Sequence, residues 1–353
     1  MSAATTSPAP SDRGKQHQPT PAEHALQLTT GYIASSAIYI AVKLGIPDLL
    51  KDGAKTTAQL AALTRTHEDR LYRVLRALAS VGVFAETTPR TFALTPAADV
   101  LRAGVAGSVR DLALWMSDPL HFRTFAELMH SVQTGETTFD HVHGQPSFEY
   151  LRDHPEESEI FNLAMTSISG MTVPAVLEAY DFSGIGTLMD VAGGHGALLR
   201  GVLNKYPAMR GVIIDLDHVI AGAKELPENK AIAHRCEFMS ADFFAKVPSG
   251  ADAIIMKHII HDWDDDKAAK ILTNCRIALS GKSGARILVV DMVVSPGNEP
   301  HFSKFLDLEM MVFPSGRERT EEEFRKLFAA SGLRLTRVVP TKSPVCVIEG
   351  VPA

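Results

Sequence analysis

The sequence predicts an α/β fold in which a doubly wound sheet follows a mainly helical, winged-helix-like region. Before residue 181, apolar residues recur at helical spacing; after it, short β-branched runs alternate with helical stretches. Two final runs, LRLTRVVP and PVCVIEG, are separated only by a short turn, so they are expected to pair antiparallel. These observations divide the chain into a helical first part and a sheet-forming second part.

The composition limits the classes of protein to consider. Of the 353 residues, 45% are hydrophobic and 22% charged, which is ordinary for a soluble globular protein. The net charge of −6 gives no reason to expect nucleic acid or an anionic membrane as a partner, and no apolar run approaches the roughly 20 residues of a membrane helix. Three widely spaced cysteines argue against a disulfide framework and fit a reducing cytoplasm.

The first 20 residues are rich in Ser, Thr and Pro and lack the apolar core of a secretion signal. We expect a disordered tail at 1–20, with a transit peptide as the alternative because acidic residues are few.

A winged-helix-like dimerisation domain is expected at 21–105. One helix is predicted over about 22–44, followed by two helices with Thr57 and Thr66 as N-caps and by a hairpin formed by VGVFAE and TFALT. This layout also occurs in DNA-binding proteins. However, the last of these helices carries Glu68 and Asp69 among its arginines, and YIASSAIYIAVKLGI is apolar well beyond one face, which favours a dimerisation surface.

Residues 106–180 are predicted to form further helices that link the two domains. The segment ESEIFNLAMTSISGM is rich in Met and Phe, including Phe161 and Met165. Core packing would explain these side chains, and so would a flexible apolar wall of a ligand pocket.

The predicted sheet domain occupies 181–353. Its five parallel strands are expected at 187–192, 211–215, 236–241, 251–259 and 285–294. Together with the terminal hairpin they predict seven strands, one of them reversed.

A glycine turn follows the first predicted strand, in DVAGGHGALL. Gly193, Gly194 and Gly196 stand where the backbone must approach a ligand closely, before a helix N-terminus. The third glycine of a dinucleotide fingerprint is replaced by Leu199, which argues against a ligand with a pyrophosphate.

Acidic residues end the next two strands. Asp215 is placed to accept hydrogen bonds from ribose hydroxyls, and Asp242 followed by Phe243 suits a purine, whose amino group and ring face need a carboxylate and an aromatic side chain. A ligand with a ribose, a purine and no diphosphate is expected, and S-adenosylmethionine fits this description.

The segment KHIIHDWDDD at the end of the fourth strand allows three interpretations. Asp264 is expected to cap the following helix, with Asp265 and Asp266 in its first turn. A metal bound by His258 and His261 is the second interpretation, but the sequence offers no matching third ligand, so we expect no metal.

General-base chemistry at His261 is the third interpretation. Imidazole titrates near neutral pH and can accept a proton from a hydroxyl. Asp291 ends the neighbouring strand and Glu318 precedes a helix near the same edge, so both are expected to hold the ring.

These motifs, together with LVVDMV and GRERTEEEF in order and spacing, resemble the small-molecule O-methyltransferases of the plant caffeate type and their bacterial relatives in natural-product pathways. Acetylserotonin methyltransferase is similar as well. The resemblance covers nearly everything after residue 20. It implies a Rossmann-like seven-stranded methyltransferase sheet, S-adenosylmethionine as cofactor and a homodimer.

The resemblance also implies residue roles. The expected cofactor-binding residues are Gly193, Gly194, Gly196, Asp215, Leu216, Asp242, Phe243 and Lys257. The expected catalytic residues are His261, Asp291 and Glu318, and the expected substrate-binding residues are Phe161, Met165 and His258. Three departures stand out: Ala192 replaces a usual glycine, Asp291 a frequent Glu, and His258 a frequent apolar residue.

The predicted function is therefore methylation of a hydroxyl on a small, aromatic acceptor by a cytoplasmic enzyme. The alternatives are a cofactor-bound relative that acts as a decarboxylase or hydroxylase, and a winged-helix regulator that senses a small ligand.

Overall fold

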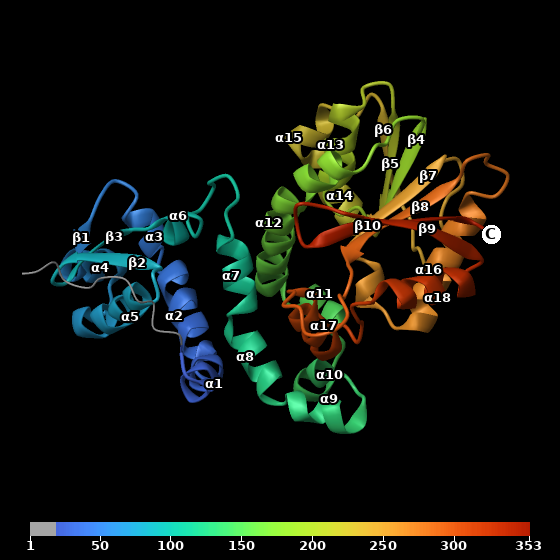
Figure 1. Ribbon diagram of the computed structural model, residues 1–353. Coiled ribbons are helices and arrows are strands. Elements are labelled where there is room, and N and C mark those ends of the chain that lie inside the picture. The colour runs from blue at the N-terminus through green and yellow to red at the C-terminus, as the bar shows by residue number, and fades with distance from the viewer. Residues whose placement is uncertain (1–18) are drawn as a thin grey trace, which may run out of the picture.

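The computed structural model describes residues 19–353. The expectation of a disordered tail at 1–20 lies outside these residues, except at its end, where Thr20 and Glu23 form a capping box on the first helix. Figure 1 shows a mainly helical N-terminal region and a sheet domain, with helices of the middle segment between them.

The N-terminal region combines helices with a small sheet whose strand order is β1-β3-β2. Its elements are α1 (Pro21–Thr29), α2 (Gly31–Lys43), α3 (Ile46–Leu49), β1 (Lys55–Thr56), α4 (Thr57–Thr64), α5 (Glu68–Ser80), β2 (Phe84–Thr88), β3 (Thr91–Leu94) and α6 (Pro96–Asp99). This is the winged-helix-like arrangement that the sequence predicts.

Two local predictions in this region were wrong. The helix expected over 22–44 is broken at Thr30 into α1 and α2, which are bent by 42°. The hydroxyls of Thr29 and Thr30 bond to carbonyls one turn earlier, a pattern that bends helices.

The second error concerns the helix caps. Thr56 rather than Thr57 caps α4, in a capping box with Gln59. Thr57 is buried and donates to the carbonyl of Arg90 in the hairpin, while the hydroxyl of Thr66 pairs with that of Thr64. Thr57 is thus engaged by a tertiary contact and Thr66 by its neighbour Thr64, and His67 stands at the N-cap of α5 without a side-chain cap.

The middle segment consists of six helices: α7 (Arg110–Met116), α8 (Pro119–Ala126), α9 (Leu128–Thr134), α10 (Thr138–His143), α11 (Ser147–Asp153) and α12 (Pro155–Ala179). By length and composition, α12 could cross a membrane, which corrects the expectation that no apolar stretch reaches this length. In the fold, α12 packs between α7 and α13 and buries Val173 and Val176 against the sheet domain (Figure 1).

The sheet domain contains seven strands in the order β6-β5-β4-β7-β8-β10-β9. The strands are β4 (Thr187–Val191), β5 (Arg210–Asp215), β6 (Cys236–Ser240), β7 (Ala253–Lys257), β8 (Arg286–Met292), β9 (Leu333–Pro340) and β10 (Val345–Pro352). The first five pair in parallel, and β10 is antiparallel to both β8 and β9, as the terminal hairpin predicts.

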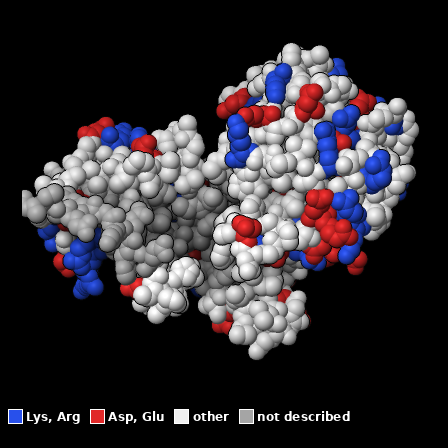
Figure 2. Space-filling model, in the orientation of Figure 1, with Lys and Arg blue, Asp and Glu red and all other residues white. Residues whose placement is uncertain are grey.

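Helices cover both faces of this sheet, as parallel strands require. The helical elements of this domain are α13 (Ala197–Lys205), α14 (Asp217–Glu225), α15 (Pro227–Lys230), the 3-10 turn η1 (Ile260–Asp262), α16 (Asp265–Ala278), α17 (Ser303–Val312) and α18 (Glu321–Ala330). One apolar core joins the sheet to α16 and α18, and a second joins it to α12 and α13. On the face shown in Figure 2, acidic and basic side chains lie interspersed over this domain.

Candidate active site

The carboxyl ends of the five parallel strands meet at one edge of the sheet, with the order reversing between β4 and β7. Ligands of doubly wound sheets bind at such a point. The predicted glycine turn follows β4, the acids Asp215 and Asp242 end or follow β5 and β6, and His261 follows β7.

The glycine turn is shaped by close backbone contacts. A Cβ on Gly193 would lie 2.9 Å from the carboxyl carbon of Asp190, and one on Gly196 would lie 2.5 Å from Ile213. Gly194 has φ +55° and open space beside it, and Gly196 precedes α13 without a side-chain cap. The turn therefore offers backbone groups and a free helix N-terminus to a ligand.

Ala192 stands at the start of this turn with φ +53°. An L-residue in the left-handed region costs roughly 1–2 kcal/mol. The alanine that replaces the usual glycine therefore keeps the turn geometry, at the cost of backbone strain.

The acids beyond β5 and β6 face the same edge. One oxygen of Asp215 accepts from the backbone of Gly194 at 2.8 Å and the other from Leu216 at 2.7 Å. Leu216 itself is 52% exposed and free to cover a ring. These bonds tie the ribose-binding candidate directly to the glycine turn.

Aromatic side chains cluster near Asp242, which is exposed. The ring of Phe243 lies 4.8 Å from that of Phe244, which in turn packs edge-on against Trp263 at 4.8 Å. Asn274 donates to the carbonyls of both phenylalanines and fixes this loop. The purine-stacking surface expected from Phe243 thus includes two further rings, Phe244 and Trp263.

Lys257 ends β7 beside the buried Asp190. Burial lowers the pKa of Lys257 and raises the pKa of Asp190 to about 7, and the charge of each partly opposes the effect on the other. The carboxyl group of Asp190 packs against the backbone of Gly193, so Asp190 is in direct contact with the glycine turn. Sequence reasoning missed Asp190, although the acid in LMDVAGGHG interrupts an otherwise apolar strand.

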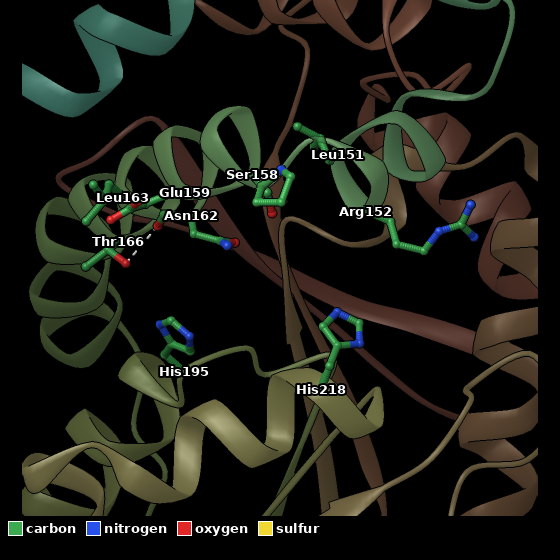
Figure 3. Close-up of a pocket in the computed structure, with 10 residues that line it drawn as sticks. Leu151, Arg152, Ser158, Glu159, Asn162, Leu163, Thr166, His195 and His218 are labelled. Atoms are coloured by element: carbon green, nitrogen blue, oxygen red, sulfur yellow. Dashed lines mark hydrogen bonds between the residues drawn. The ribbon is translucent and has the colours of Figure 1, made fainter.

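A cavity of about 640 Å³ opens between α12 and the glycine turn. Figure 3 shows Asn162 and Thr166 of α12 facing His195 of the glycine turn and His218 of α14 across this space. His195 and His218 were not predicted as site residues. The cavity adjoins the cofactor edge, and its lining does not include His261.

His261 and Glu318 form a short, buried pair. Nδ1 of His261 lies 2.6 Å from Oε1 of Glu318, and the two side chains are 8% and 0% exposed. Burial alone would lower the pKa of His261, but the neighbouring carboxylates, Glu318 first, raise it to about 10. The pair makes the ring a strong base whose Nε2 points away from Glu318.

The segment that carries Glu318 is pressed against the histidine loop. Gly316 lies so close that a Cβ there would stand 1.9 Å from the carbonyl oxygen of His261. The fully buried Arg319 donates to the carbonyls of Ile260 and Trp263. Gly316 and Arg319 flank Glu318 in GRERT, but nothing in the sequence reveals which loop they contact.

Asp291 contacts His258 more closely than His261. Its Oδ1 accepts from the backbone N–H of His258 at 2.9 Å and lies 3.9 Å from Nδ1 of that ring. The expectation that two acids hold His261 is therefore met by Glu318, whereas Asp291 lies beside both histidines without a hydrogen bond to the His261 ring in the described part of the chain.

Asp262 is a further acid that the sequence reading did not select. Its Oδ1 lies 3.5 Å from Nε2 of His261, and its side chain is 18% exposed. Burial raises its pKa to about 7. A carboxyl group thus stands between the ring and the solvent.

Phe161 and Met165 lie half-buried one turn apart on α12. They pack against a cluster that contains Trp115 and Phe313, and Phe161 lies 5.2 Å from Trp115. Phe148 connects this cluster to the histidine loop, with its ring 6.4 Å from Phe161 and 6.2 Å from Trp263. The predicted pocket wall is therefore linked to the histidine loop by aromatic contacts.

The donor atoms of His258, His261 and Asp291 lie within 4.8 Å of one another. Asp291 is the third potential ligand that the sequence reading did not find. The same atoms can bind either the hydrogen-bonding groups of a methyl acceptor or a divalent cation. Removing metal ions with EDTA distinguishes the two kinds of ligand.

Comparison with known proteins identifies the family. The O-methyltransferase domain matches residues 125–334, and the O-methyltransferase dimerisation domain matches residues 26–104. Phenazine O-methyltransferase PhzM from Lysobacter antibioticus is 42% identical over 93% of this chain and 95% of its own length. The mitomycin biosynthesis 6-O-methyltransferase of Streptomyces lavendulae is 38% identical over 98% of this chain and 99% of its own length.

A solved structure agrees with these matches. CalO1, a methyltransferase in calicheamicin biosynthesis solved with S-adenosylhomocysteine, superposes with a TM-score of 0.83 at 34% identity, over 95% of this chain and 100% of its own. The glycine turn, the two acids and the aromatic group fit an adenosyl cofactor. The chain belongs to the S-adenosylmethionine-dependent O-methyltransferases.

Proposed function

We propose that the protein methylates a hydroxyl group of a small aromatic acceptor and that His261 is the general base. The observation that carries this proposal is the 2.6 Å contact between Nδ1 of His261 and Glu318, which leaves Nε2 to face an acceptor. The names of two relatives, a phenazine O-methyltransferase and a 6-O-methyltransferase of mitomycin biosynthesis, support a small-molecule acceptor, which the phenazine name indicates to be aromatic.

The cofactor-binding residues proposed are those of the glycine turn, Asp215, Leu216, Asp242 and Phe243, with Lys257 beneath them. Asp215 would accept from ribose hydroxyls, and Phe243 would stack on the purine beside Leu216. Bound S-adenosylmethionine supplies an electrophilic methyl group.

The protein's own chemistry is to place a hydroxyl and remove its proton. The neutral fraction of His261, which grows as the pH rises toward its pKa of about 10, accepts the hydroxyl proton at Nε2, and Glu318 stabilises the imidazolium that results. The raised pKa of His261 brings its basicity close to that of a phenol, whose usual pKa is about 10. Asp262, near Nε2 and partly exposed, is placed to pass the proton on to solvent.

Positioning should contribute more than proton transfer. Effective molarities for well-oriented groups reach on the order of 10⁵ M or more, whereas general-base assistance contributes about 10²–10⁴-fold. The aromatic cluster around Phe161 and Met165 is the proposed wall that orients the acceptor and keeps water out.

The test is a screen of hydroxyaromatic compounds with isotopically labelled S-adenosylmethionine, read by mass spectrometry. His261→Ala should lower turnover about 10²–10⁴-fold and leave affinity for S-adenosylhomocysteine nearly unchanged. The exposed His234 gives the control variant His234→Ala, which should behave as wild type. Wild-type turnover in His261→Ala would exclude the proposed base.

The N-terminal dimerisation domain indicates a homodimer. Leu26, Leu28, Tyr32 and Ile33 on α1 and α2 are more than half exposed, which supports this region as the contact surface. We also propose that the enzyme works in the cytoplasm, since three free cysteines suit a reducing compartment.

A further inference from the structure

The site contains a second histidine–carboxylate pair beside the first. The ring of His258 lies 5.1 Å from that of His261, and its Nδ1 lies 3.9 Å from Asp291, beyond hydrogen-bond distance, whereas Nδ1 of His261 lies 2.6 Å from Glu318. Removing one proton from one hydroxyl requires only one such pair. The second pair therefore calls for its own explanation.

The polar atoms of the second pair lack partners. Both ring nitrogens of His258 and Oδ2 of Asp291 are buried without a hydrogen bond to any described residue. The two side chains are only 9% and 0% exposed. Each unsatisfied buried group costs about 1–3 kcal/mol and calls for an explanation, such as a catalytic role or a bound partner.

The backbone also holds His258 in a strained position. Its φ is +55°, and its N–H is bound by the carbonyl of Val290 at 3.1 Å and by Asp291 at 2.9 Å. Strain of order 1–3 kcal/mol persists only where the surrounding structure imposes it, commonly at functional sites. The fold thus fixes this imidazole beside the base.

The chemistry of the pair can be specified. Burial lowers the pKa of His258 well below its usual value, so the ring is neutral. Asp291 lies on the Nδ1 side of the ring, and in the tautomer with its proton on Nδ1 the unpartnered Nε2 is an acceptor. The pair therefore suits a ligand group that donates an O–H or N–H.

We infer that the acceptor carries a hydroxyl or amino group on the ring carbon next to the methylated oxygen, and that His258 binds this neighbouring group. The inference rests on the proposed function of His261. One ring nitrogen of His258 lies within 4.8 Å of one ring nitrogen of His261, a spacing that lets the two rings contact two adjacent substituents. Neighbouring substituents point to the same side of a ring, whereas substituents on opposite carbons point apart.

The test compares catechol and 2-aminophenol with phenol and hydroquinone. We expect the wild-type enzyme to show a kcat/KM about 10–100-fold higher for catechol and 2-aminophenol, the range for a buried hydrogen bond that is either made or left unsatisfied. His258→Phe should reduce this preference to about onefold. Catechol should lose most of its advantage, and phenol should change far less.

Controls separate folding from recognition. Affinity for S-adenosylhomocysteine and the melting temperature show whether His258→Phe is folded, and His258→Asn, which keeps hydrogen-bonding atoms, should retain part of the preference. His234→Phe at an exposed position should retain all of it. If only larger hydroxyaromatics are turned over, the same comparison applies to a monohydroxy compound and its vicinal dihydroxy analogue.

Equal kcat/KM values for catechol and phenol, or a preference that survives in His258→Phe, would overturn this inference and leave the proposed function standing. Absence of methyl transfer to every hydroxyaromatic in the wider screen would instead overturn the proposed function.

Discussion

Replacement of Glu318 by Gln tests how the base is activated, since it removes one charge and little volume. Glu318 is 0% exposed and lies 2.6 Å from Nδ1 of His261. Opposite charges about 4 Å apart interact by about 4 kcal/mol at an effective dielectric of 20. Breaking a buried charged pair costs about 2–5 kcal/mol, and each 1.36 kcal/mol in the barrier is tenfold in rate.

We therefore expect Glu318→Gln to lower kcat about 10²–10³-fold. Without the carboxylate, burial dominates and the pKa of His261 falls, so the rising limb of the pH–rate profile should move to lower pH. Initial rates of methylated product, measured by mass spectrometry across the pH range, give both quantities. Glu322→Gln, on a side chain that is 64% exposed, is the matched control. A Glu318→Gln enzyme with wild-type rate and pH profile would refute the reasoning.

Three further predictions follow from the same contacts. Gly316→Ala should lower the stability of the fold by about 1–3 kcal/mol and should also lower turnover, because the new Cβ would lie 1.9 Å from the carbonyl oxygen of His261. The control Gly31→Ala places its Cβ in open space and should change neither quantity. Urea unfolding measures the stability, and initial rates measure the turnover. Dialysis against EDTA should leave turnover unchanged, and Zn²⁺ should inhibit in competition with the acceptor through His258, His261 and Asp291; activity lost to EDTA and restored by metal would contradict the base mechanism. Because its pKa is raised in the fold, His261 should stabilise the folded protein fully below the usual histidine pKa of about 6.5, and this stabilisation should be lost as the pH rises through about 10. Over that pH range the urea midpoint of Glu318→Gln should therefore fall less steeply than that of the wild type.

Much of the fold could be predicted because patterning and topology agree. The strand–helix alternation after residue 181 predicts β4 to β8 within a few residues, and the short final turn predicts the reversed strand β10. The broken helix at Thr30 and the caps of α4 and α5 were missed. Their outcome depends on which partner each hydroxyl bonds, a carbonyl for Thr30 and Thr57 and the Thr64 hydroxyl for Thr66, a choice that propensity does not fix.

The site was predictable where residues share one sheet edge. Asp215 reaches the glycine turn and Glu318 reaches His261 because strand ends and adjoining loops converge there. The contacts of the histidine loop were not predictable. Asp291, near the end of β8, accepts from the backbone of His258, and Asp262 approaches Nε2 of His261, next to a left-handed residue at His258 that no sequence pattern signals.

The most direct test of the proposed mechanism is a crystal structure of the enzyme with S-adenosylhomocysteine and a methyl acceptor found in the screen. The acceptor hydroxyl should lie within hydrogen-bond distance of Nε2 of His261, on the side facing the cofactor sulfur, with Nδ1 still bound to Glu318. An acceptor bound away from this ring, or a ring turned so that Nε2 faces the protein interior, would contradict the proposal.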